Sequence, residues 1–385
     1  MRIILFAHPL FLGQQSMPRF TNMLAEGMRK RGYEVAVYSP EPHFFKLPLP
    51  GPLKKWMGYI DQFVLFPAIV KKRIKAQTNT LYVFTDHALG IWVPITKHLP
   101  HVVICHDFLA QRSAKGDIRQ NPTGWSGRVY QQLIHKGYTT GANFISVSKK
   151  TQQDLHRFLG KIPAMSTVVY NGLNNNFTVI DVKVARQALS EKTGITIPNG
   201  YILHVGGNQW YKNRTGVVKI YNEWRKTFNN DLPLLLIGAP SSHDLDLEIE
   251  ASPYCSSIYT LCDIDDRHVN MAYSGAAALL FPSYAEGFGW PIVEAMAAGC
   301  PVITTNEAPM TEVGGEAAAY IPVQSLGDVK IGMWAKEAAK VLDQVVSLPE
   351  AERLKILARG FANAKRFDTD NALDLFEKIF STILS

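Results

Sequence analysis

Two carboxylates in the second half of the chain, Glu286 and Glu294, are spaced so that both can hold one hydroxyl-rich ligand. Seven residues separate them, and carboxylates accept hydrogen bonds from vicinal hydroxyls, so one can bind a sugar while the other binds a ribose. An isolated pair of this kind would more often be a solvated loop acid and an acid that complements a helix dipole. The surrounding sequence decides between these two interpretations.

The segment around the two acids is typical of a strand, a glycine-bearing loop and a helix. The strand is expected to end at Phe281, and the helix is expected to begin near Pro291 and stop at Gly299. Gly287 and Gly289 lack a Cβ atom, so the loop backbone can approach a ligand closely. The free N–H groups at the start of the helix favour anionic oxygens. This segment therefore predicts a diphosphate site.

The run from Pro282 to Ile303 resembles the Glu-x7-Glu donor motif of the retaining glycosyltransferases of family 4. Residues 144–151 and 169–173 resemble two further segments of that family, in the same order along the chain. The resemblance implies the GT-B fold, an α/β fold of two doubly wound Rossmann-like domains that face each other across a cleft. By resemblance, the donor contacts are Glu286, Gly287, Phe288, Gly289 and Glu294, with Glu286 also at the reaction centre.

The family resemblance also implies the chemistry of the reaction. A nucleoside-diphosphate hexose, linked to UDP or GDP and carrying mannose, glucose or N-acetylglucosamine, would donate its sugar to a hydroxyl of a glycan or of a lipid-linked acceptor. The anomeric configuration would be retained, and we expect neither a metal ion nor another cofactor. Synthesis of cell-surface polysaccharides or glycoconjugates uses transfers of this kind.

A glycine-containing turn at residues 204–214 opens the second domain and is expected to bind the donor diphosphate. Lys212 matches the lysine that family members present to the phosphates, and we also count it as catalytic. Gly207 stands where the family usually has an arginine, so we expect Arg214 or Asn208 to make that contact instead. The alternative, a solvated lysine at a helix start, is locally unfavourable without an anion, because the dipole there is positive.

Polar residues that follow two strands of the first domain are candidates for the reacting groups. His106 comes directly after the predicted strand 102–105, where the family has a histidine that contacts the donor sugar near the reaction centre. Asp107 beside it, and the pair Asp86 and His87 after an earlier strand, are expected to contact the acceptor. An isolated histidine would more often be a satisfied core or loop residue.

Two further loops are assigned to the ligands. Gly13 lies in the loop after the first strand and is counted among the donor contacts. That loop has no Gly-x-Gly-x-x-Gly fingerprint, so it is expected to receive a substrate and not to cradle a pyrophosphate alone; the alternative is a plain connection. By resemblance, the backbone near Ile264 meets the edge of the nucleobase, so side-chain identity there does not choose between uridine and guanosine.

Short apolar runs that alternate with helical patterns predict parallel sheets with crossover helices along nearly the whole chain. The expected strands are residues 3–7, 34–38, 81–84, 102–105, 144–147 and 168–170, and then 201–205, 234–237, 258–261, 278–281, 302–304 and 318–321. A polar stretch between the two series places the domain boundary near residues 180–198. We expect an acceptor domain at 1–185 and a donor domain at 198–368, with a helix at 369–384 that packs back on the first domain.

Length and composition support a globular protein of two domains. The 385 residues are 46% apolar and 19% charged. The net charge of +7 and the pI near 9.0 suit phosphate-bearing ligands, an anionic membrane surface or nucleic acid, and we expect no nucleic-acid partner. The four cysteines lack zinc-site spacing, and we find neither a signal peptide nor a membrane span, so we expect a cytoplasmic protein.

A basic and aromatic stretch at residues 44–75 is expected to contact an anionic membrane at its inner face, which would suit a lipid-linked acceptor. Its aromatic residues are Phe44, Phe45, Trp56, Tyr59, Phe63 and Phe66, and its cations are Lys46, Lys54, Lys55, Lys71, Lys72, Arg73 and Lys75. The alternative is that the aromatic side chains complete the core of the first domain while the lysines are solvated. Four prolines divide the stretch into short helices.

Three other functions share parts of this pattern. A GT-B epimerase or phosphorylase would use the same cleft, although we find no lysine site for a phosphorylase cofactor. A noncatalytic nucleotide-sugar binding protein would show no turnover with an acceptor. A dehydrogenase fits least, because the sequence has no strand-linked dinucleotide fingerprint.

Overall fold

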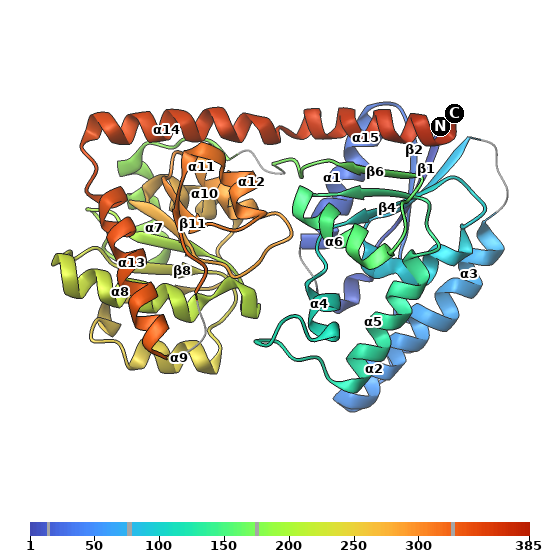
Figure 1. Ribbon diagram of the computed structural model, residues 1–385, viewed down its shortest axis with the longest axis horizontal. Coiled ribbons are helices and arrows are strands. Elements are labelled where there is room, and N and C mark those ends of the chain that lie inside the picture. Colours follow the sequence, from blue (N-terminus) through green and yellow to red (C-terminus); the bar gives the residue numbers. More distant parts are fainter. Residues whose placement is uncertain (14–15, 75–78, 174–176, 325–327) are drawn as a thin grey trace. The chain divides into compact units, whose positions relative to one another are not determined.

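The computed structural model describes residues 1–13, 16–74, 79–173, 177–324 and 328–385, and the chain forms two compact units. The first unit comprises residues 1–174 together with 369–385, and the second comprises residues 175–368. Each unit contains one six-stranded sheet (Figure 1). Lys75, the last residue of the basic and aromatic stretch, lies outside the described residues.

The sheet of the first unit is parallel and has the strand order β2-β1-β3-β4-β5-β6. Its strands are β1 (Arg2–Phe6), β2 (Glu34–Tyr38), β3 (Thr80–Phe84), β4 (His101–Cys105), β5 (Asn143–Ser146) and β6 (Met165–Val168). All six expected strands are confirmed, although the last begins at Met165 and not at residue 168. The chain runs from β1 toward one edge of the sheet and from β3 toward the other, so the topological switch point lies between β1 and β3.

Helical segments connect these strands and cover the sheet. They are η1 (Leu10–Leu12), α1 (Ser16–Lys30), α2 (Gly51–Ile60), η2 (Asp61–Leu65), α3 (Phe66–Arg73), η3 (His87–Ile95), α4 (Leu109–Lys115), α5 (Trp125–Tyr138), α6 (Lys149–Leu159) and α15 (Thr369–Leu384). Strands β3 and β4 are buried along their whole length, as expected for parallel strands that are covered on both faces. Phe6 stacks on Phe84 across β1 and β3 with ring centroids 4.6 Å apart, which anchors the middle of this core.

The C-terminal helix α15 belongs to the first unit, where it packs on α1. A Cβ atom on Gly27 of α1 would lie 2.4 Å from a Leu373 methyl group, so the absence of a side chain allows the two helices to approach closely. Arg31 pairs with Asp374 of α15 at 2.8 Å, and the Phe20 ring lies edge-on to Phe376. A segment far along the sequence thus completes the first core.

The second sheet is also parallel and has the strand order β12-β11-β10-β7-β8-β9. Its strands are β7 (Ile202–Val205), β8 (Leu234–Ile237), β9 (Ile258–Leu261), β10 (Ala278–Phe281), β11 (Val302–Thr305) and β12 (Ala318–Ile321), which confirms the second predicted series. Counted within the unit, this is the 3-2-1-4-5-6 order of dinucleotide-binding folds. Its switch point lies between β7 and β10.

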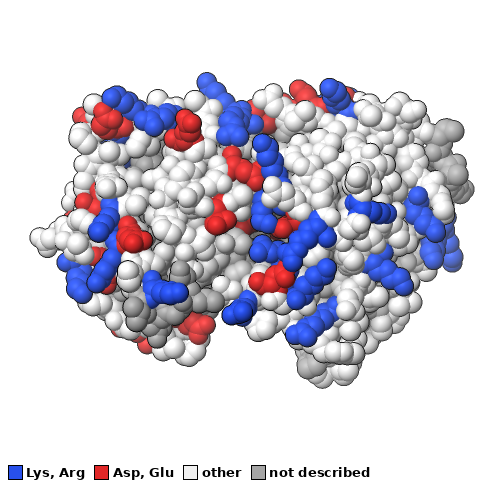
Figure 2. Space-filling model, in the orientation of Figure 1, with Lys and Arg blue, Asp and Glu red and all other residues white. Residues whose placement is uncertain are grey.

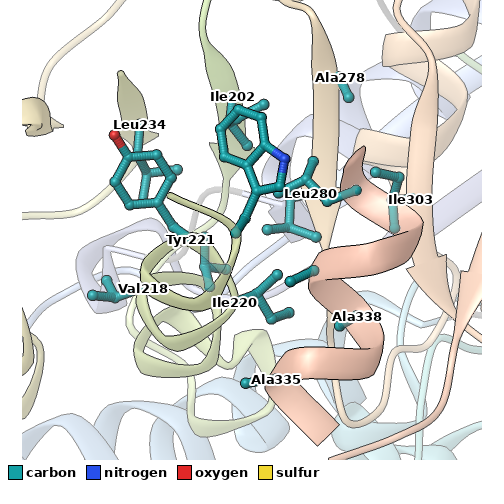
Figure 3. Close-up of a cluster of buried hydrophobic side chains, with 14 of the residues drawn as sticks. Ile202, Val218, Ile220, Tyr221, Leu234, Ala278, Leu280, Ile303, Ala335 and Ala338 are labelled. Carbon is teal, nitrogen blue, oxygen red and sulfur yellow. The ribbon is translucent and has the colours of Figure 1, made fainter. Parts of the chain in front are cut away.

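Helices cover the second sheet and form a large apolar core with it (Figure 3). They are α7 (Val182–Thr193), η4 (Trp210–Lys212), α8 (Arg214–Phe228), α9 (His243–Glu250), η5 (Cys255–Ser257), α10 (Asp266–Gly275), α11 (Trp290–Ala297), α12 (Met310–Gly314), η6 (Gly315–Ala317), α13 (Asp328–Val346), α14 (Glu350–Ala364) and η7 (Lys365–Phe367). Trp224 and Tyr221 of α8 are fully buried in that core, to which Ala335 and Ala338 of α13 also belong. The small alanine side chains allow α13 to lie close to α8.

The boundary between the units falls at residue 174, earlier than the expected 180–198. Helix α7 begins after its N-cap Asp181 and packs on α10 of the second unit. Arg186 of α7 donates to the Gly275 carbonyl at 2.9 Å. The polar composition of this region therefore reflects a solvated, capped helix as well as a connection, which is why composition alone placed the boundary too late.

Candidate functional site

The switch point of the second sheet brings Lys212 and Glu286 together. Lys212 closes the short η4 helix after β7, and Glu286 lies in the loop after β10. The Lys212 Nζ atom lies 2.8 Å from Glu286 Oε1, and the two side chains are 14% and 7% exposed. The same ammonium lies 4.9 Å from the centre of the Phe281 ring, so an aromatic face also stabilises its charge. Their roles in donor binding stay predictions.

Two main-chain anchors fix the relative position of these loops. Asn213, which adopts a left-handed φ of 53°, caps α8 and donates from its Nδ2 atom to the Pro282 carbonyl at 3.1 Å. The Tyr284 N–H donates to the Tyr211 carbonyl at 2.8 Å. Both bonds join the β7 loop to the β10 loop beside the Lys212–Glu286 pair. The sequence analysis did not single out Asn213, although an asparagine before a helix is a recognisable cap signal.

Glu294 lies inside α11, as the fifth residue of that helix, and its side chain is buried. Its Oε2 atom accepts a hydrogen bond from the Tyr273 hydroxyl at 3.0 Å. The helix begins after Gly289, which has a φ of 105°, a conformation that favours glycine. Glu294 is thus beyond the first turn, so the alternative in which it only complements the helix dipole does not fit its position.

Arg214 and Asn208, the two candidates for the missing phosphate contact, are bonded to each other. The Arg214 Nη1 atom donates to Asn208 Oδ1 and, at 3.0 Å, to the Ala239 carbonyl. Arg214 is buried, and burial lowers the pKa of its guanidinium. Its Nε and Nη2 atoms have no hydrogen-bond partner within the described part of the chain. A buried cation with two unused donor groups is suited to an anionic ligand.

His204, which the sequence analysis did not single out, lies fully buried beneath the Lys212 loop. Its Nδ1 atom donates to the Leu280 carbonyl at 2.9 Å. Burial lowers the pKa of this imidazole to about 3, so the ring is neutral at physiological pH. A Cβ atom on Gly206 would lie 3.0 Å from His204 Nε2 and 3.4 Å from the Lys212 stem, so the glycine leaves room for both side chains.

The remaining donor contacts predicted in the second unit lie along the same edge of its sheet. Phe288 is buried against Phe367 with ring centroids 5.5 Å apart, so its side chain serves the core and only its backbone is available to a ligand. Gly287 precedes it in the loop after β10. Ile264 is half-buried in the loop after β9, two strands from β7. Carboxyl ends of parallel strands share one edge, so Ile264 and Lys212 lie on the same side of the sheet.

The switch point of the first sheet holds a second acid and base pair, His8 and Asp86. His8 follows β1, and Asp86 follows β3. The His8 Nε2 atom lies 2.9 Å from Asp86 Oδ2, and the side chains are 10% and 11% exposed. On the other side, the His87 Nδ1 atom lies 2.9 Å from Asp86 Oδ1, but without the alignment of a hydrogen bond. Asp86 and His87 were predicted; His8 was missed because nothing local marks it.

The two histidines hold Asp86 in its ionised form. Burial alone would raise the pKa of this carboxyl, but the charge of His87 and the hydrogen bond from His8 outweigh it, and the pKa stays well below its usual value. The carboxylate can only accept hydrogen bonds, so the His8 Nε2 atom must carry the proton. In the neutral tautomer of His8, the acceptor lone pair then lies on Nδ1.

His106 and Asp107 follow β4 and are held by the surrounding main chain. The His106 Nε2 atom lies 2.9 Å from the Thr85 carbonyl, and the ring lies edge-on to Phe20 at 4.6 Å. Burial lowers the pKa of His106, so it is neutral near pH 7. Burial raises the pKa of Asp107, whose Oδ1 atom accepts the Leu109 N–H at 2.9 Å. The contacts of both residues with ligands stay predictions.

Gly13 lies in open space, whereas the aromatic side chains of the basic and aromatic stretch are partly buried and partly exposed. Gly13 ends η1 with a φ of 68°, and space around it is open. Phe66 is buried in the core, as the alternative interpretation expects, Tyr59 stacks on Tyr130 of α5, and the Phe63 ring packs against Tyr130 at a tilt. Trp56, in contrast, is 59% exposed on α2. No helix in the described ranges is long and apolar enough to cross a membrane.

The described residues contain no group of three or more His, Cys, Asp or Glu side chains arranged to hold a metal ion. At the switch point of the second sheet, positive charge comes from Lys212 and Arg214. These cations lie where the carboxyl ends of strands and the starts of helices meet, which is where open α/β sheets bind their ligands.

The sequence matches two protein families, described as Glycosyl transferases group 1 over residues 185–354 and Glycosyltransferase Family 4 over residues 17–177. It is 29% identical over 174 residues to O-antigen chain mannosyltransferase B of Escherichia coli, a match that covers 45% of this chain and 43% of that protein. It is 25% identical over 304 residues to alpha-monoglucosyldiacylglycerol synthase of Acholeplasma laidlawii, covering 73% and 74% of the two chains. The chain thus spans less than half the length of the mannosyltransferase.

Solved structures with the same arrangement of elements cover the whole chain. Sucrose-phosphate synthase from Thermosynechococcus elongatus superposes with a TM-score of 0.74 at 15% identity, covering 100% of this chain and 99% of that chain. Anabaena Alr3699/HepE, solved with UDP and glucose, superposes with a TM-score of 0.72 at 15% identity, covering 99% and 100%. At this identity the likeness concerns the fold, which is the GT-B fold.

Proposed function

This chain belongs to glycosyltransferase family 4, and from that premise we propose that it transfers a hexose from a nucleoside-diphosphate sugar to a hydroxyl group, with retention of the anomeric configuration. The donor is a UDP- or GDP-linked hexose such as mannose, glucose or N-acetylglucosamine. The acceptor is a glycan or a lipid-linked molecule in cell-surface polysaccharide or glycoconjugate synthesis. The names of the relatives, two mannosyltransferases and a monoglucosyldiacylglycerol synthase, support these classes.

The Lys212–Glu286 pair is the observation that supports the donor site most strongly. An ammonium and a carboxylate 2.8 Å apart neutralise each other in the free protein. In the proposed complex, Lys212 turns to the diphosphate, and Glu286 accepts a hydrogen bond from a hydroxyl of the sugar. The positive charge of Lys212 then stabilises the negative charge that develops on the departing nucleoside diphosphate.

The neighbouring groups complete the proposed donor contacts. Arg214, with Asn208 as its hydrogen-bond partner, takes the place of the family's phosphate-binding arginine through its unused donor groups. Backbone N–H groups from Gly287 to Gly289 bind phosphate oxygens, and Glu294 binds the ribose hydroxyls. The backbone near Ile264 meets the nucleobase, and Gly13 allows a close approach of the main chain to the donor. No metal ion is required in this arrangement.

The first unit supplies the groups proposed to act on the sugar and the acceptor. His106 contacts the donor sugar near the reaction centre as a neutral ring, consistent with the effect of burial on its pKa. Asp86, His87 and Asp107 position the acceptor. The departing diphosphate takes the proton of the acceptor hydroxyl as the new glycosidic bond forms and the bond from the anomeric carbon to the phosphate breaks.

We also propose that the first unit rests on an anionic membrane surface at the cytoplasmic face. This unit holds 23 Lys and Arg and 11 Asp and Glu, a formal charge of +12, whereas the second unit holds 17 and 22, a formal charge of −5. Figure 2 shows one face of the protein, on which blue Lys and Arg side chains gather over the first unit. Basic surfaces with exposed aromatic side chains bind anionic headgroups.

Exposed apolar residues on α2 and α5 support this membrane proposal. Leu53 and Trp56 of α2 are 50% and 59% exposed, beside the exposed Lys54 and Lys55. Helix α5 carries Trp125, Val129 and Leu133 at four-residue spacing, and all three are exposed. Tyr59 of α2 stacks on Tyr130 of α5, so the two helices are neighbours.

The membrane proposal is tested by co-sedimentation with liposomes that contain anionic lipid. Reversal of charge at Lys54 and Lys55 to Glu should reduce pelleting, and added salt should reduce pelleting of the unchanged protein. Equal pelleting of both proteins, insensitive to salt, would contradict it.

The transferase proposal is tested by measuring nucleoside diphosphate release from a panel of UDP- and GDP-hexoses, with and without acceptors. We expect release with one donor that depends on an acceptor and on Lys212. Binding of a donor with no turnover on any acceptor would support a binding protein instead. Interconversion of the donor sugar without an acceptor would support an epimerase.

A further inference from the structure

A cavity of about 200 Å³ lies in the first unit, next to the switch point that holds His8 and Asp86. Its walls come from η2, η3 and α5, and the loop after β1 adds His8 and the exposed Leu12 to its partly open side. Most of its lining is apolar or aromatic, and the principal residues are Phe63, Leu89, Ile91, Trp92, Tyr130 and Ile134.

The polar groups of two wall residues, Trp92 and Gln62, are satisfied by the protein itself. The Trp92 Nε1 atom donates to the Gln62 carbonyl at 2.9 Å, and the Gln62 side chain donates to the Gly58 carbonyl at 2.9 Å. Burial raises the pKa of Tyr130 to about 12, so its phenol stays neutral. These walls therefore offer apolar surface and few groups that could hold the hydroxyls of a saccharide.

One lining residue differs, because His8 has an unused acceptor. Its Nε2 atom is bonded to Asp86, as described above, and the Nδ1 atom forms no hydrogen bond with any residue that the structure describes. Nδ1 is the atom that carries the lone pair in the tautomer fixed by the carboxylate. The cavity thus combines largely apolar walls with polar side chains, among them those of His8 and Gln131.

We propose that this cavity binds the apolar group of the acceptor, an alkyl chain or an aromatic ring, while His8 Nδ1 accepts a hydrogen bond from a hydroxyl of the attached polar head. This inference rests on the proposed transferase function and names the class of acceptor, an amphipathic alcohol. The volume corresponds to about seven water molecules, so it holds one ring or a short run of methylene groups and leaves a longer chain outside.

The proposal is tested by calorimetric binding of methyl, butyl and hexyl β-D-glucopyranoside to the full chain without any nucleotide sugar. Each methylene group that enters the cavity should tighten binding by about fourfold, so hexyl should bind at least tenfold more tightly than methyl. Equal affinities along the series would overturn the proposal. This part of the test needs no variant and so does not depend on one that folds.

Two substitutions locate the binding. Ala88 lines the cavity and is half-buried, so Ala88→Leu should fill part of the space and remove most of the dependence on chain length. Ala68→Leu makes the same change at an exposed position of α3 and should leave the series unchanged. If chain-length dependence persists in Ala88→Leu, the alkyl group binds elsewhere and the assignment is overturned.

A third substitution tests the polar part of the proposal. His8→Leu should weaken all three glucosides by a similar factor and keep the ratio between hexyl and methyl. His8→Asn places an oxygen acceptor near the position of Nδ1 and should restore part of the loss. An unchanged affinity in His8→Leu would contradict the role of His8.

Transfer activity separates this inference from the function on which it rests. If no acceptor of any kind is glycosylated while the alkyl series binds as expected, the transferase proposal fails and the cavity is still a binding site. If transfer occurs but binding and KM are independent of chain length, the transferase proposal stands and the cavity assignment fails.

Discussion

Both units of this protein place an acid and a basic side chain at the switch point of their sheet, but the two pairs differ in chemistry. In the second unit, Lys212 and Glu286 lie 2.8 Å apart after β7 and β10. In the first, His8 and Asp86 lie 2.9 Å apart after β1 and β3. One pair contains a permanent cation that suits a diphosphate, whereas the other contains a ring that offers a lone pair. Strand order thus sets where a site lies, and residue type sets what it binds.

The charge of the two units contrasts with the charge at their sites. The second unit has a formal charge of −5, yet it concentrates Lys212 and the buried Arg214 at the proposed diphosphate site. The first unit has a formal charge of +12, yet its cavity is apolar and its cations lie mostly on the surface. The net charge of a unit therefore influences which partners its surface attracts at long range. The ligand that a binding site selects depends on the few charged and polar groups inside the site.

Removal of the Lys212 ammonium should have the largest effect. Lys212→Ala is expected to lower kcat by about 10²–10³-fold, because the developing charge of the leaving group loses its principal cation. Lys219→Ala serves as the control, since Lys219 lies on α8 and pairs with Glu248 instead. The kcat of both variants is measured from the steady-state release of nucleoside diphosphate. Near-normal transfer by Lys212→Ala at saturating donor would break the proposed distinction between the two pairs.

Substitution of Glu294 should have the second-largest effect, and it should change the binding of the donor but not of the acceptor. Glu294→Gln keeps the volume of the buried side chain and should weaken donor binding by about tenfold to a hundredfold, because a charged acceptor for the ribose is lost. Tyr273→Phe removes the hydroxyl that donates to Glu294 at 3.0 Å and should weaken donor binding by about fivefold. An increase in the acceptor KM with an unchanged donor KM would contradict the assignment.

Substitution of Asp86 should affect the opposite substrate. Asp86→Asn removes the charge that fixes the His8 tautomer and should raise the acceptor KM by about tenfold while the donor KM stays the same. The low pKa of Asp86 keeps this carboxyl ionised down to acidic pH. Kinetics with each substrate varied in turn make this measurement. A donor KM that rises equally would mean that the two switch points do not act separately.

The smallest expected effect is on stability, through His204. Its folded pKa of about 3 lies below the ordinary histidine value near 6.5, so its contribution to stability is fully present above about pH 6.5. That contribution is lost progressively as pH falls from about 6.5 toward 3, because the unfolded chain then binds the proton first. His204→Phe removes this titration and should flatten the decrease of Tm between pH 6.5 and 4. An unchanged slope would show that His204 is not neutral in the folded protein.

Local patterns predicted much of the fold and part of the site. Apolar runs between helical patterns located all twelve strands, because each buried parallel strand is itself apolar. Lys212, Glu286 and Glu294 were selected because the segments that carry them resemble motifs of the family, and their roles stay predictions. His8, His204 and the cavity were not found, since each depends on contacts between residues far apart in the sequence. His8, for example, meets Asp86 78 residues later, and no local signal marks that pairing.

Calorimetric titration of UDP and GDP into the full chain tests the central claim most directly. We predict that one of the two nucleotides binds, that Lys212→Ala weakens this binding at least tenfold, and that Asp86→Asn leaves it unchanged. The account would be contradicted if neither nucleotide binds, or if Lys212→Ala binds as tightly as the unchanged protein.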